Sequence, residues 1–460
     1  MEKTTSFIKT NIHFIGIGGV SMSALAHLMI NLGYSVSGSD MVKNSFTQSL
    51  EKLGVNIYLG HNENNIPKNT FLVVYTGAIK SNNVEYLRAQ EKGLEVMERS
   101  QFLGWVAQKY KNVIAVSGTH GKTTTTAMLG DIFIEAHKNP TIHLGGESES
   151  INSNVLNGGT QFFITEACEY RNSFKYIIPT ISVVTNIEKD HTDWYENMGQ
   201  IVDAFSLFVN NSTQNVVVFE NAEFVNHIKN GKKVVSCGFN GNYDVKGYNL
   251  HKNIDGCYSF DVKYNNTYIG RFNLNVIGLH NAKNALCAIA VALLFEVDIS
   301  AIYRGIKRFR GVKRRYEQVG EYKGVPIVAD YAHHPTEIKN SIKGALITHK
   351  KILCIFQPHT YSRTLSLINE FKGAFVGVEK LVVYKTYKAR EKYIKGGSAQ
   401  DLFNVVKVKS KNKYYCNSQK CLTQTLLSID DDYDLILVLG AGDIYEIIKK
   451  VCANLKKSVD

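Results

Sequence analysis

The sequence predicts an α/β protein of three domains, with a Rossmann-like domain at each end and a central α/β domain that carries antiparallel hairpins. Short apolar runs that end in polar residues alternate with helix-compatible stretches along most of the chain, a pattern typical of parallel sheets. The length of 460 residues suits about three domains. Abundant glycine (36) and scarce proline (6) suit many turns between strands and helices. We place the domains at residues 1–106, 107–312 and 313–460.

The composition excludes several classes of protein. Apolar residues (44%) and charged residues (20%) have the proportions of a globular protein that is not embedded in a membrane. No run approaches 18 apolar residues, so we expect no membrane span, and residues 12–30 break midway from strand into helix, unlike a signal peptide. None of the eight cysteines forms a Cys-x-x-Cys pair, which indicates a reducing, cytoplasmic setting.

The formal charge of +12 has two interpretations. It attracts either nucleic acid or small polyanions. Apart from a cluster at residues 307–315, the basic residues are scattered, so we expect no nucleic-acid partner. A nucleic-acid-binding NTPase remains an alternative that a test of stimulation by DNA or RNA can decide.

The first domain opens with a strand, a helix and a second strand. Residues 11–15 form an apolar run, residues 21–32 have the apolar spacing of a helix, and residues 34–38 form the next run. Between the first run and the helix the chain turns through three glycines, Gly16, Gly18 and Gly19. This arrangement is typical of the start of a nucleotide-binding sheet.

The glycine turn predicts a phosphate site. Asp40 lies at about the right distance to meet a ribose, so a dinucleotide-binding dehydrogenase is one interpretation. Ser21 occupies the place of the third glycine of that motif, and a second phosphate-type loop follows later, so we favour a nucleotide sugar. Thr76 and Ala78 follow the strand at residues 71–75 and lie at the same sheet edge. Arg99 is either a ligand contact or a surface ion pair.

The central domain begins with a phosphate loop. Residues 113–117 form a strand, and we predict a helix over residues 126–136. The loop between them supplies Gly118, Thr119, His120, Gly121, Lys122, Thr123 and Thr124. Glycines let backbone amides close on a phosphate, Lys122 can reach the β- and γ-phosphates, and the Thr123 hydroxyl can bind Mg²⁺. Val116 replaces one glycine of the common pattern, but the physical arrangement of a P-loop ATPase is kept, and the alternative is a plain turn with a surface lysine.

Acidic residues follow two further strands of this domain. Glu166 ends the strand at residues 162–165, where a carboxylate beside a phosphate loop is the expected second ligand of Mg²⁺. His191 lies among acids after the strand at residues 181–186. We favour a metal or substrate-carboxylate site there over a structural histidine.

Residues 234–277 contain short alternating runs separated by Asn-Gly, Asp-Gly and Asn-Asn, which predict antiparallel hairpins. A helix then follows over residues 278–295. Asn281 and Asn284 near its start can recognise a base, or they form a plain helix cap with Asn284 exposed.

The last third repeats the pattern of buried strands with polar ends, at residues 325–329, 352–356, 381–384 and 435–439. It predicts a second doubly wound unit, with ligands at the strand ends. The candidates at these ends are Asp330, Tyr331, His333, His359 and Arg363. Arg315, in the basic cluster before them, can reach a transferred phosphate from a moving domain.

In their order along essentially the whole chain, these motifs resemble the Mur ligase superfamily. The matching stretches are residues 16–19, 118–124, 185–191, 280–284, 314–316, 330–337, 357–363 and 440–444. The resemblance implies an ATP-dependent amide ligase of peptidoglycan synthesis, which joins L-alanine to the carboxylate of UDP-N-acetylmuramate through an acyl phosphate. A related ligase that adds a preformed peptide to the same sugar is the alternative. The expected cofactors are ATP and two magnesium ions, and we expect a monomer or a weak homodimer.

The resemblance also implies roles for individual residues. For catalysis these are Lys122, Glu166, His191 and Arg315. The residues expected to bind ATP are the loop residues named above together with Asn281, Asn284, Arg315 and Asp330. The residues expected to bind Mg²⁺ are Thr123, Glu166 and His191. The residues expected to bind the nucleotide sugar are Gly16, Gly18, Gly19, Asp40, Thr76, Ala78 and Arg99. The residues expected to bind the amino acid are Tyr331, His333, His359 and Arg363.

Two stretches depart from the family pattern. Ser21 stands where glycine is usual, so the turn at the nucleotide sugar can differ slightly. Glu166-Ala-Cys-Glu-Tyr-Arg171 replaces the commoner Glu-Ala-Asp-Glu-Ser-Asp, which leaves the roles of Glu169 and Arg171 open.

Overall fold

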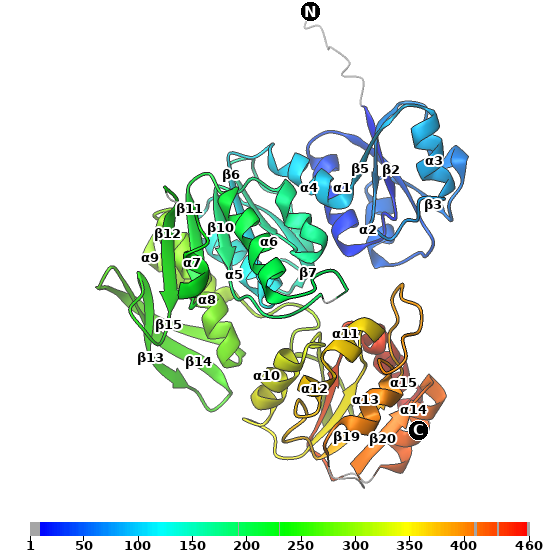
Figure 1. The fold of residues 1–460 in the computed structure, drawn as a ribbon, viewed down its shortest axis with the longest axis vertical. Helices are drawn as coiled ribbons and strands as arrows, with labels where there is room; N and C mark the ends of the chain where they lie inside the picture. Colours follow the sequence, from blue (N-terminus) through cyan, green and yellow to red (C-terminus); the bar gives the residue numbers. More distant parts are fainter. Residues whose placement is uncertain (1–9, 192, 230, 409–411, 430–431, 458–460) are drawn as a thin grey trace, which may run out of the picture.

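The computed structural model describes residues 10–191, 193–229, 231–408, 412–429 and 432–457, and it contains three sheets that follow one another along the chain (Figure 1). This confirms the predicted three-domain α/β fold. All eight cysteines are free thiols. No helix of the described residues combines the length and the apolar character needed to cross a membrane.

The N-terminal sheet has five parallel strands in the order β3-β2-β1-β4-β5. They are β1 (Asn11–Ile15), β2 (Ser35–Asp40), β3 (Asn56–Leu59), β4 (Thr70–Tyr75) and β5 (Glu95–Glu98). The helices are α1 (Val20–Asn31), α2 (Ser45–Lys52), α3 (Val84–Glu91) and α4 (Arg99–Ala107), with a 3-10 turn η1 (Glu63–Asn65). Strand β2 begins and ends later than predicted, because its last residues pair with β3 as far as Asp40.

The central sheet has ten strands in the order β15-β14-β13-β12-β11-β10-β6-β9-β7-β8. They are β6 (Asn112–Ser117), β7 (Thr141–Ser148), β8 (Ser153–Leu156), β9 (Phe162–Glu166), β10 (Ile181–Val184), β11 (Asn215–Phe219), β12 (Lys233–Gly238), β13 (Val245–Lys252), β14 (Cys257–Tyr264) and β15 (Thr267–Ile277). The helical elements are α5 (Lys122–Glu135), η2 (Tyr170–Tyr176), α6 (Met198–Asn210), α7 (Ala222–Val225), α8 (Leu279–Leu294) and α9 (Ile299–Arg308). Helix α5 packs against both α8 and α9 over one apolar core.

Two predictions for this domain need correction. The hairpins are antiparallel only from β13 to β15, whereas β12 runs parallel to β11 and to β13. Strand β12 therefore belongs to the parallel part of the sheet. Its apolar residues Val235 and Cys237 are buried in the apolar core around α5. Helix α5 begins at Lys122, four residues before the predicted start. Its four threonines are weak helix formers, but all four are buried, so tertiary packing outweighs local propensity.

The C-terminal sheet has six strands in the order β16-β17-β21-β18-β19-β20, parallel except at β16. They are β16 (Glu317–Tyr322), β17 (Val325–Asp330), β18 (Ile352–Phe356), β19 (Lys380–Tyr384), β20 (Lys413–Cys416) and β21 (Leu435–Leu439). The helices are α10 (Pro335–Ala345), α11 (Tyr361–Ser366), α12 (Ile368–Phe371), α13 (Ala399–Val405), α14 (Gln419–Ser428) and α15 (Ile444–Lys457). Separate apolar cores lie on the two faces of this sheet, as a doubly wound domain requires.

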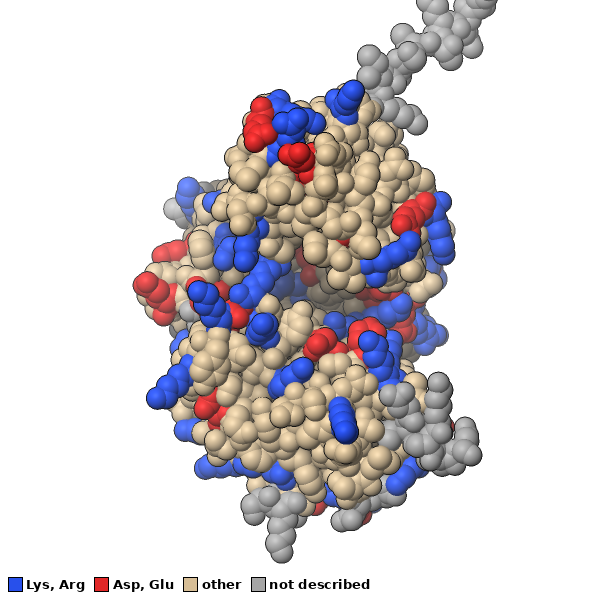
Figure 2. All heavy atoms as spheres, turned by 90° about the vertical axis from the view of Figure 1, so that its right-hand side faces the viewer, with Lys and Arg blue, Asp and Glu red and all other residues tan. Residues whose placement is uncertain are grey.

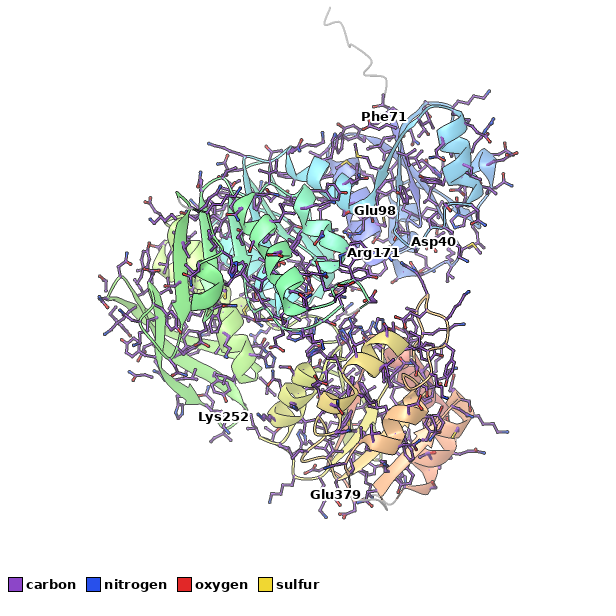
Figure 3. The ribbon with its side chains drawn as sticks, viewed as in Figure 1. Asp40, Phe71, Glu98, Arg171, Lys252 and Glu379 are labelled. Carbon is purple, nitrogen blue, oxygen red and sulfur yellow. The ribbon has the colours of Figure 1, made fainter. Side chains whose placement is uncertain are left out.

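The three domains leave a groove between the first and the last. In the side view, Lys and Arg side chains lie on both sides of the groove that separates the upper, N-terminal domain from the lower, C-terminal domain (Figure 2). Asp40 lies at the end of the N-terminal domain that faces this groove (Figure 3). The carboxyl ends of the parallel strands, where ligands bind in such sheets, thus point toward the meeting place of the domains.

Candidate active site

The phosphate loop joins β6 to α5 and is closed by its own lysine. Gly121 has a φ of +84°, a conformation that favours glycine, and α5 starts at the next residue. Lys122 Nζ donates hydrogen bonds to the carbonyl oxygens of Gly118 (2.6 Å) and Thr119 (3.2 Å). It also lies 3.0 Å from Glu169 Oε2. Burial opposes its charge, but Glu169 outweighs this effect and raises the pKa of Lys122, so the ammonium is kept.

The end of β10 fixes the loop from the other side. Asn186 Oδ1 accepts from the backbone N–H of His120 (2.9 Å), and Asn186 Nδ2 donates to the carbonyl oxygen of His120 (2.9 Å). The Thr185 hydroxyl donates to the same carbonyl (2.6 Å). These bonds keep the loop preorganised for an anion at the start of α5.

Thr123 and Glu166 form a pair of oxygen ligands beside the loop. The Thr123 hydroxyl donates to Glu166 Oε2 (3.0 Å), and the Gly145 amide donates to Glu166 Oε1. Burial raises the pKa of Glu166, so a cation here would relieve the cost of the buried carboxylate. A hydroxyl and a carboxylate are ligand types that Mg²⁺ prefers, so the residues present fit a magnesium ion.

Glu169 contacts two of the catalytic candidates, Lys122 and His191. Its Oε1 lies 3.1 Å from Lys122 Nζ and 3.3 Å from His191 Nε2. Burial opposes its ionisation, but Lys122 and His191 outweigh it and lower the pKa of Glu169. Lys122 and His191 therefore face one buried carboxylate, whose role the sequence left open.

A cavity of about 500 Å³ adjoins the loop, a volume typical of small-molecule sites. Seven of the residues predicted to bind ATP line this cavity: His120, Gly121, Thr124, Asn281, Asn284, Arg315 and Asp330. The lining residues that were not predicted from the sequence include Phe219, Glu220, Asn221, His280 and Lys283. The signal for Glu220 and Asn221 is their position directly after β11, at the same sheet edge as the loop.

Asn284 is buried (6% exposed), so the alternative of an exposed helix cap is wrong. Gly278 stands at the N-cap of α8, and Asn281 Nδ2 donates to the carbonyl oxygen of Ile277 (2.8 Å). A Cβ at Gly121 would lie 2.3 Å from Asn284 Oδ1. The loop and the asparagines therefore lie in direct contact.

The C-terminal domain meets the phosphate loop through Glu337, on the first turn of α10. Glu337 Oε1 lies 3.0 Å from His120 Nδ1 and 3.7 Å from Arg315 Nη1. Thr336 Oγ1 donates to Glu188 Oε2 (2.9 Å) across the same interface. Burial opposes the ionisation of Glu337, but His333, His120 and Arg315 outweigh it and lower its pKa far below the usual range.

The amino-acid candidates lie together on this domain. The ring of His333 is 5.4 Å from that of Tyr331 and 5.6 Å from that of His359. Arg363 Nη1 donates to the carbonyl oxygen of His359 (3.1 Å). Burial, chiefly, lowers the pKa of His333 to about 3 and that of His359 to about 4, so both rings are neutral near pH 7.

The nucleotide-sugar candidates lie on the N-terminal domain. The Gly18 amide donates to Asp40 Oδ2 (2.8 Å), so Asp40 fixes the glycine turn. At Gly16 the φ of +84° favours glycine, and a Cβ would lie 2.6 Å from Thr76 Cγ2. The Ala78 amide lies 3.5 Å from Thr76 Oγ1.

Arg99 and Ser21 connect this domain with the central one. Arg99 Nη1 lies 3.5 Å from the Ser21 hydroxyl, which is also 3.0 Å from His143 Nε2. Among the described residues Arg99 has no ion pair, so the alternative of a surface ion pair is not what the structure contains. Ser21, the departure from the glycine pattern, uses its hydroxyl at this junction.

Three family models match the chain in succession. Residues 11–111 match the catalytic domain of the Mur ligase family, residues 116–292 the Mur ligase middle domain, and residues 314–442 the glutamate ligase domain of Mur ligases. The chain belongs to the Mur ligase family.

Within that family the curated relatives point to one activity. The UDP-N-acetylmuramate–L-alanine ligase of Clostridium acetobutylicum is 43% identical over 448 residues, which cover 96% of this chain and 97% of that protein. The enzyme of the same name from Caldanaerobacter subterraneus is 39% identical over 451 residues, covering 97% and 98%. The crystal structure of UDP-N-acetylmuramate-alanine ligase MurC from Thermotoga maritima has a TM-score of 0.82 at 28% identity, covering 97% and 99%. A murein peptide ligase from Psychrobacter arcticus shares the fold, with a TM-score of 0.74 at 23% identity.

Proposed function

We propose that this protein is an ATP-dependent ligase that joins L-alanine to the carboxylate of UDP-N-acetylmuramate and releases ADP and phosphate. The observation that carries the proposal is the meeting of Lys122 and His191 on one buried carboxylate, Glu169, next to the buried His/Arg cluster of the C-terminal domain. Full-length relatives named for this reaction support it. Because the reaction consumes ATP and a nucleotide sugar, we place it in the cytoplasm.

The chemistry follows from the leaving group. A free carboxylate cannot form an amide directly, because oxide would have to leave. The sugar carboxylate attacks the γ-phosphorus of ATP, the bond to the β–γ bridging oxygen breaks, and an acyl phosphate and ADP form. The amine of L-alanine then attacks the carbonyl carbon, loses a proton, and phosphate leaves.

The residues of the site divide this work among three domains. Lys122 and Arg315 neutralise charge on the transferred phosphoryl group. Asn281 and Asn284 contact the adenine, and Asp330 the ribose. Mg²⁺, bound by Thr123 and Glu166 with a second ion at His191, would neutralise further phosphate charge.

The N-terminal glycine turn with Arg99 binds the nucleotide sugar, and residues 313–460 bring the amino acid. For the acceptor we assign Tyr331, His333, His359 and Arg363. For the sugar carboxylate we assign a path to the phosphate loop along the groove between the first and last domains, the groove itself being visible in Figure 2.

Phosphate release from ATP tests the proposal. We expect release only when UDP-N-acetylmuramate and L-alanine are both present, with an amide product of matching stoichiometry. Release that needs a tripeptide in place of L-alanine would favour the peptide-adding alternative. Release stimulated by DNA or RNA without the sugar, or binding of NADH at the first domain, would refute the proposal.

A further inference from the structure

A buried ion pair joins the central and C-terminal domains beside the candidate active site. Arg363 Nε donates to Asp190 Oδ1 at 2.9 Å. Asp190 is 6% exposed and Arg363 is 9% exposed. Asp190 follows β10 in the central domain, whereas Arg363 lies on α11 of the C-terminal domain. Such a pair costs desolvation on both sides, so its presence calls for a reason other than stability.

On the central domain, Asp190 is tied to the candidate metal histidine. Its Oδ1 also accepts from the backbone N–H of His191 (2.7 Å), and its Oδ2 lies 3.9 Å from His191 Nε2. The ring of His191 in turn contacts Glu169, which contacts Lys122. Asp190 is thus the last member of a chain of contacts that begins at the phosphate loop.

On the C-terminal domain, Arg363 is oriented by a histidine. Its Nη1 lies 2.9 Å from His359 Nδ1 and donates to the carbonyl oxygen of His359. A guanidinium can only donate, so Nδ1 of His359 accepts and the ring proton is on Nε2. Asp190 and His359 therefore fix two of the three guanidinium nitrogens of Arg363.

The third nitrogen is available to a ligand. None of the hydrogen bonds between described residues uses Arg363 Nη2. A planar cation with two nitrogens fixed presents the third in a set direction, and carboxylates are the anions that such a donor recognises. His333 and His359 beside it are neutral, so of these three side chains Arg363 is the one that carries a positive charge for a carboxylate.

We propose that Asp190 is a positioning residue, which orients Arg363 so that Nη2 binds the carboxylate of the incoming amino acid. Through its bond to His191, the same side chain links acceptor binding to the phosphate-transfer site. This inference rests on the proposed ligase function. It predicts that Asp190 acts on the affinity for the amino acid rather than on the affinity for ATP or the sugar.

Steady-state kinetics of three variants test it. In Asp190→Ala, Arg363 loses a charged partner, and we expect the KM for L-alanine to rise about tenfold or more while the KM for ATP stays within twofold, on the scale of one charge-assisted hydrogen bond. Asp190→Asn keeps an oxygen that can accept from Nε, so it should recover most of the loss. Glu196→Gln is the matched control, because this exposed acid of the segment between β10 and α6 accepts from Gln200 (3.3 Å) and not from Arg363.

A double-variant cycle separates the action through Arg363 from an action through His191. In the background Arg363→Ala, Asp190→Ala should raise the KM for L-alanine no further. A KM for L-alanine that is unchanged in Asp190→Ala, or an equal rise in both backgrounds, overturns the inference. A changed magnesium dependence with an unaltered KM for L-alanine also overturns it.

Circular dichroism of each variant, together with the kinetics of Asp190→Asn, distinguishes a loss of amino-acid binding from a folding defect. If the unaltered enzyme forms no product from L-alanine, the proposed function itself fails. If that enzyme is active and the Asp190 variants behave as the Glu196→Gln control does, only the role of Asp190 fails.

Discussion

Raising the pH from 6 to 10 should release the C-terminal domain from the phosphate loop, because a charged histidine links the two. His120 Nδ1 lies 3.0 Å from Glu337 Oε1, and its Nε2 lies 3.5 Å from Glu188 Oε2. Burial opposes the charge of the ring. Glu337 and Glu188 outweigh this effect and raise the pKa of His120 from 6.5 to about 9.

The size of the effect follows from the two pKa values. A rise from 6.5 to about 9 corresponds to roughly 3 kcal/mol in favour of the closed, ion-paired arrangement. Because the pKa in the closed form lies above the ordinary value, this contribution is fully present below pH 6.5 and is lost as the pH rises through about 9. At pH 7.5 about 2 kcal/mol should remain, and at pH 10 almost nothing.

An NMR titration of the histidine ring protons measures the pKa of His120, with His120→Gln identifying its signal. X-ray scattering at pH 7 and pH 9.5 measures the opening. The control Glu337→Gln should lower the pKa of His120, because it removes the main charge that raises it. A pKa of His120 near 6.5 in the unaltered protein would refute the reasoning, as would an opening with pH that His120→Gln shows equally.

Three further predictions concern the central domain. Lys122→Ala should lower turnover by about 10²- to 10³-fold, the scale for a preorganised charge, and near-native turnover would exclude its role. Gly121→Ala should weaken ATP binding in a calorimetric titration, because its Cβ would lie 2.3 Å from Asn284 Oδ1 at a φ of +84°; unchanged affinity would contradict this. Asp131→Asn should raise the free energy of unfolding by up to about 3 kcal/mol at pH 8 but not at pH 4. Among the described residues, neither oxygen of the buried Asp131 carboxylate (1% exposed) has a hydrogen-bond partner, and its ion-pair partner Arg308 lies 3.6 Å away, from Nε to Oδ1. Burial outweighs the attraction of Arg308 and raises the pKa of Asp131 from 3.8 to about 6, so its stabilising contribution is lost as the pH rises through about 6; denaturation curves at both pH values check this.

Much of the fold could be read from the sequence because buried parallel strands are short apolar runs. Strands β18 and β21 have the predicted bounds, since a charged residue precedes each apolar run and a glutamine or a glycine follows it. The start of α5 could not be predicted in this way. Its threonines disfavour a helix in isolation, and only their burial against neighbouring elements stabilises one.

The site was predictable where ligand residues follow strands of one sheet. Glu166 and His191 illustrate this, because they lie at or after the ends of β9 and β10, two parallel strands of the central sheet whose carboxyl ends lie at a common edge. Contacts between domains carry no such signal. Glu337 was expected only as part of a motif, yet it contacts His120 of another domain, and this contact depends on how two separately folded sheets meet.

Two residues of the segment 166–171, Glu169 and Tyr170, contact His191. Glu169 is retained, and it carries the contacts to both Lys122 and His191. Tyr170, in place of the commoner serine, lies 4.7 Å from the ring of His191 and donates from its hydroxyl to Asp193 (2.7 Å). Arg171, in place of an aspartate, lies over the rings of Tyr170 and Trp194 and is visible on the central domain in Figure 3. A carboxylate and an aromatic ring thus support the histidine together, and Arg171 adds a positive charge on this side of the site, which attracts anionic substrates.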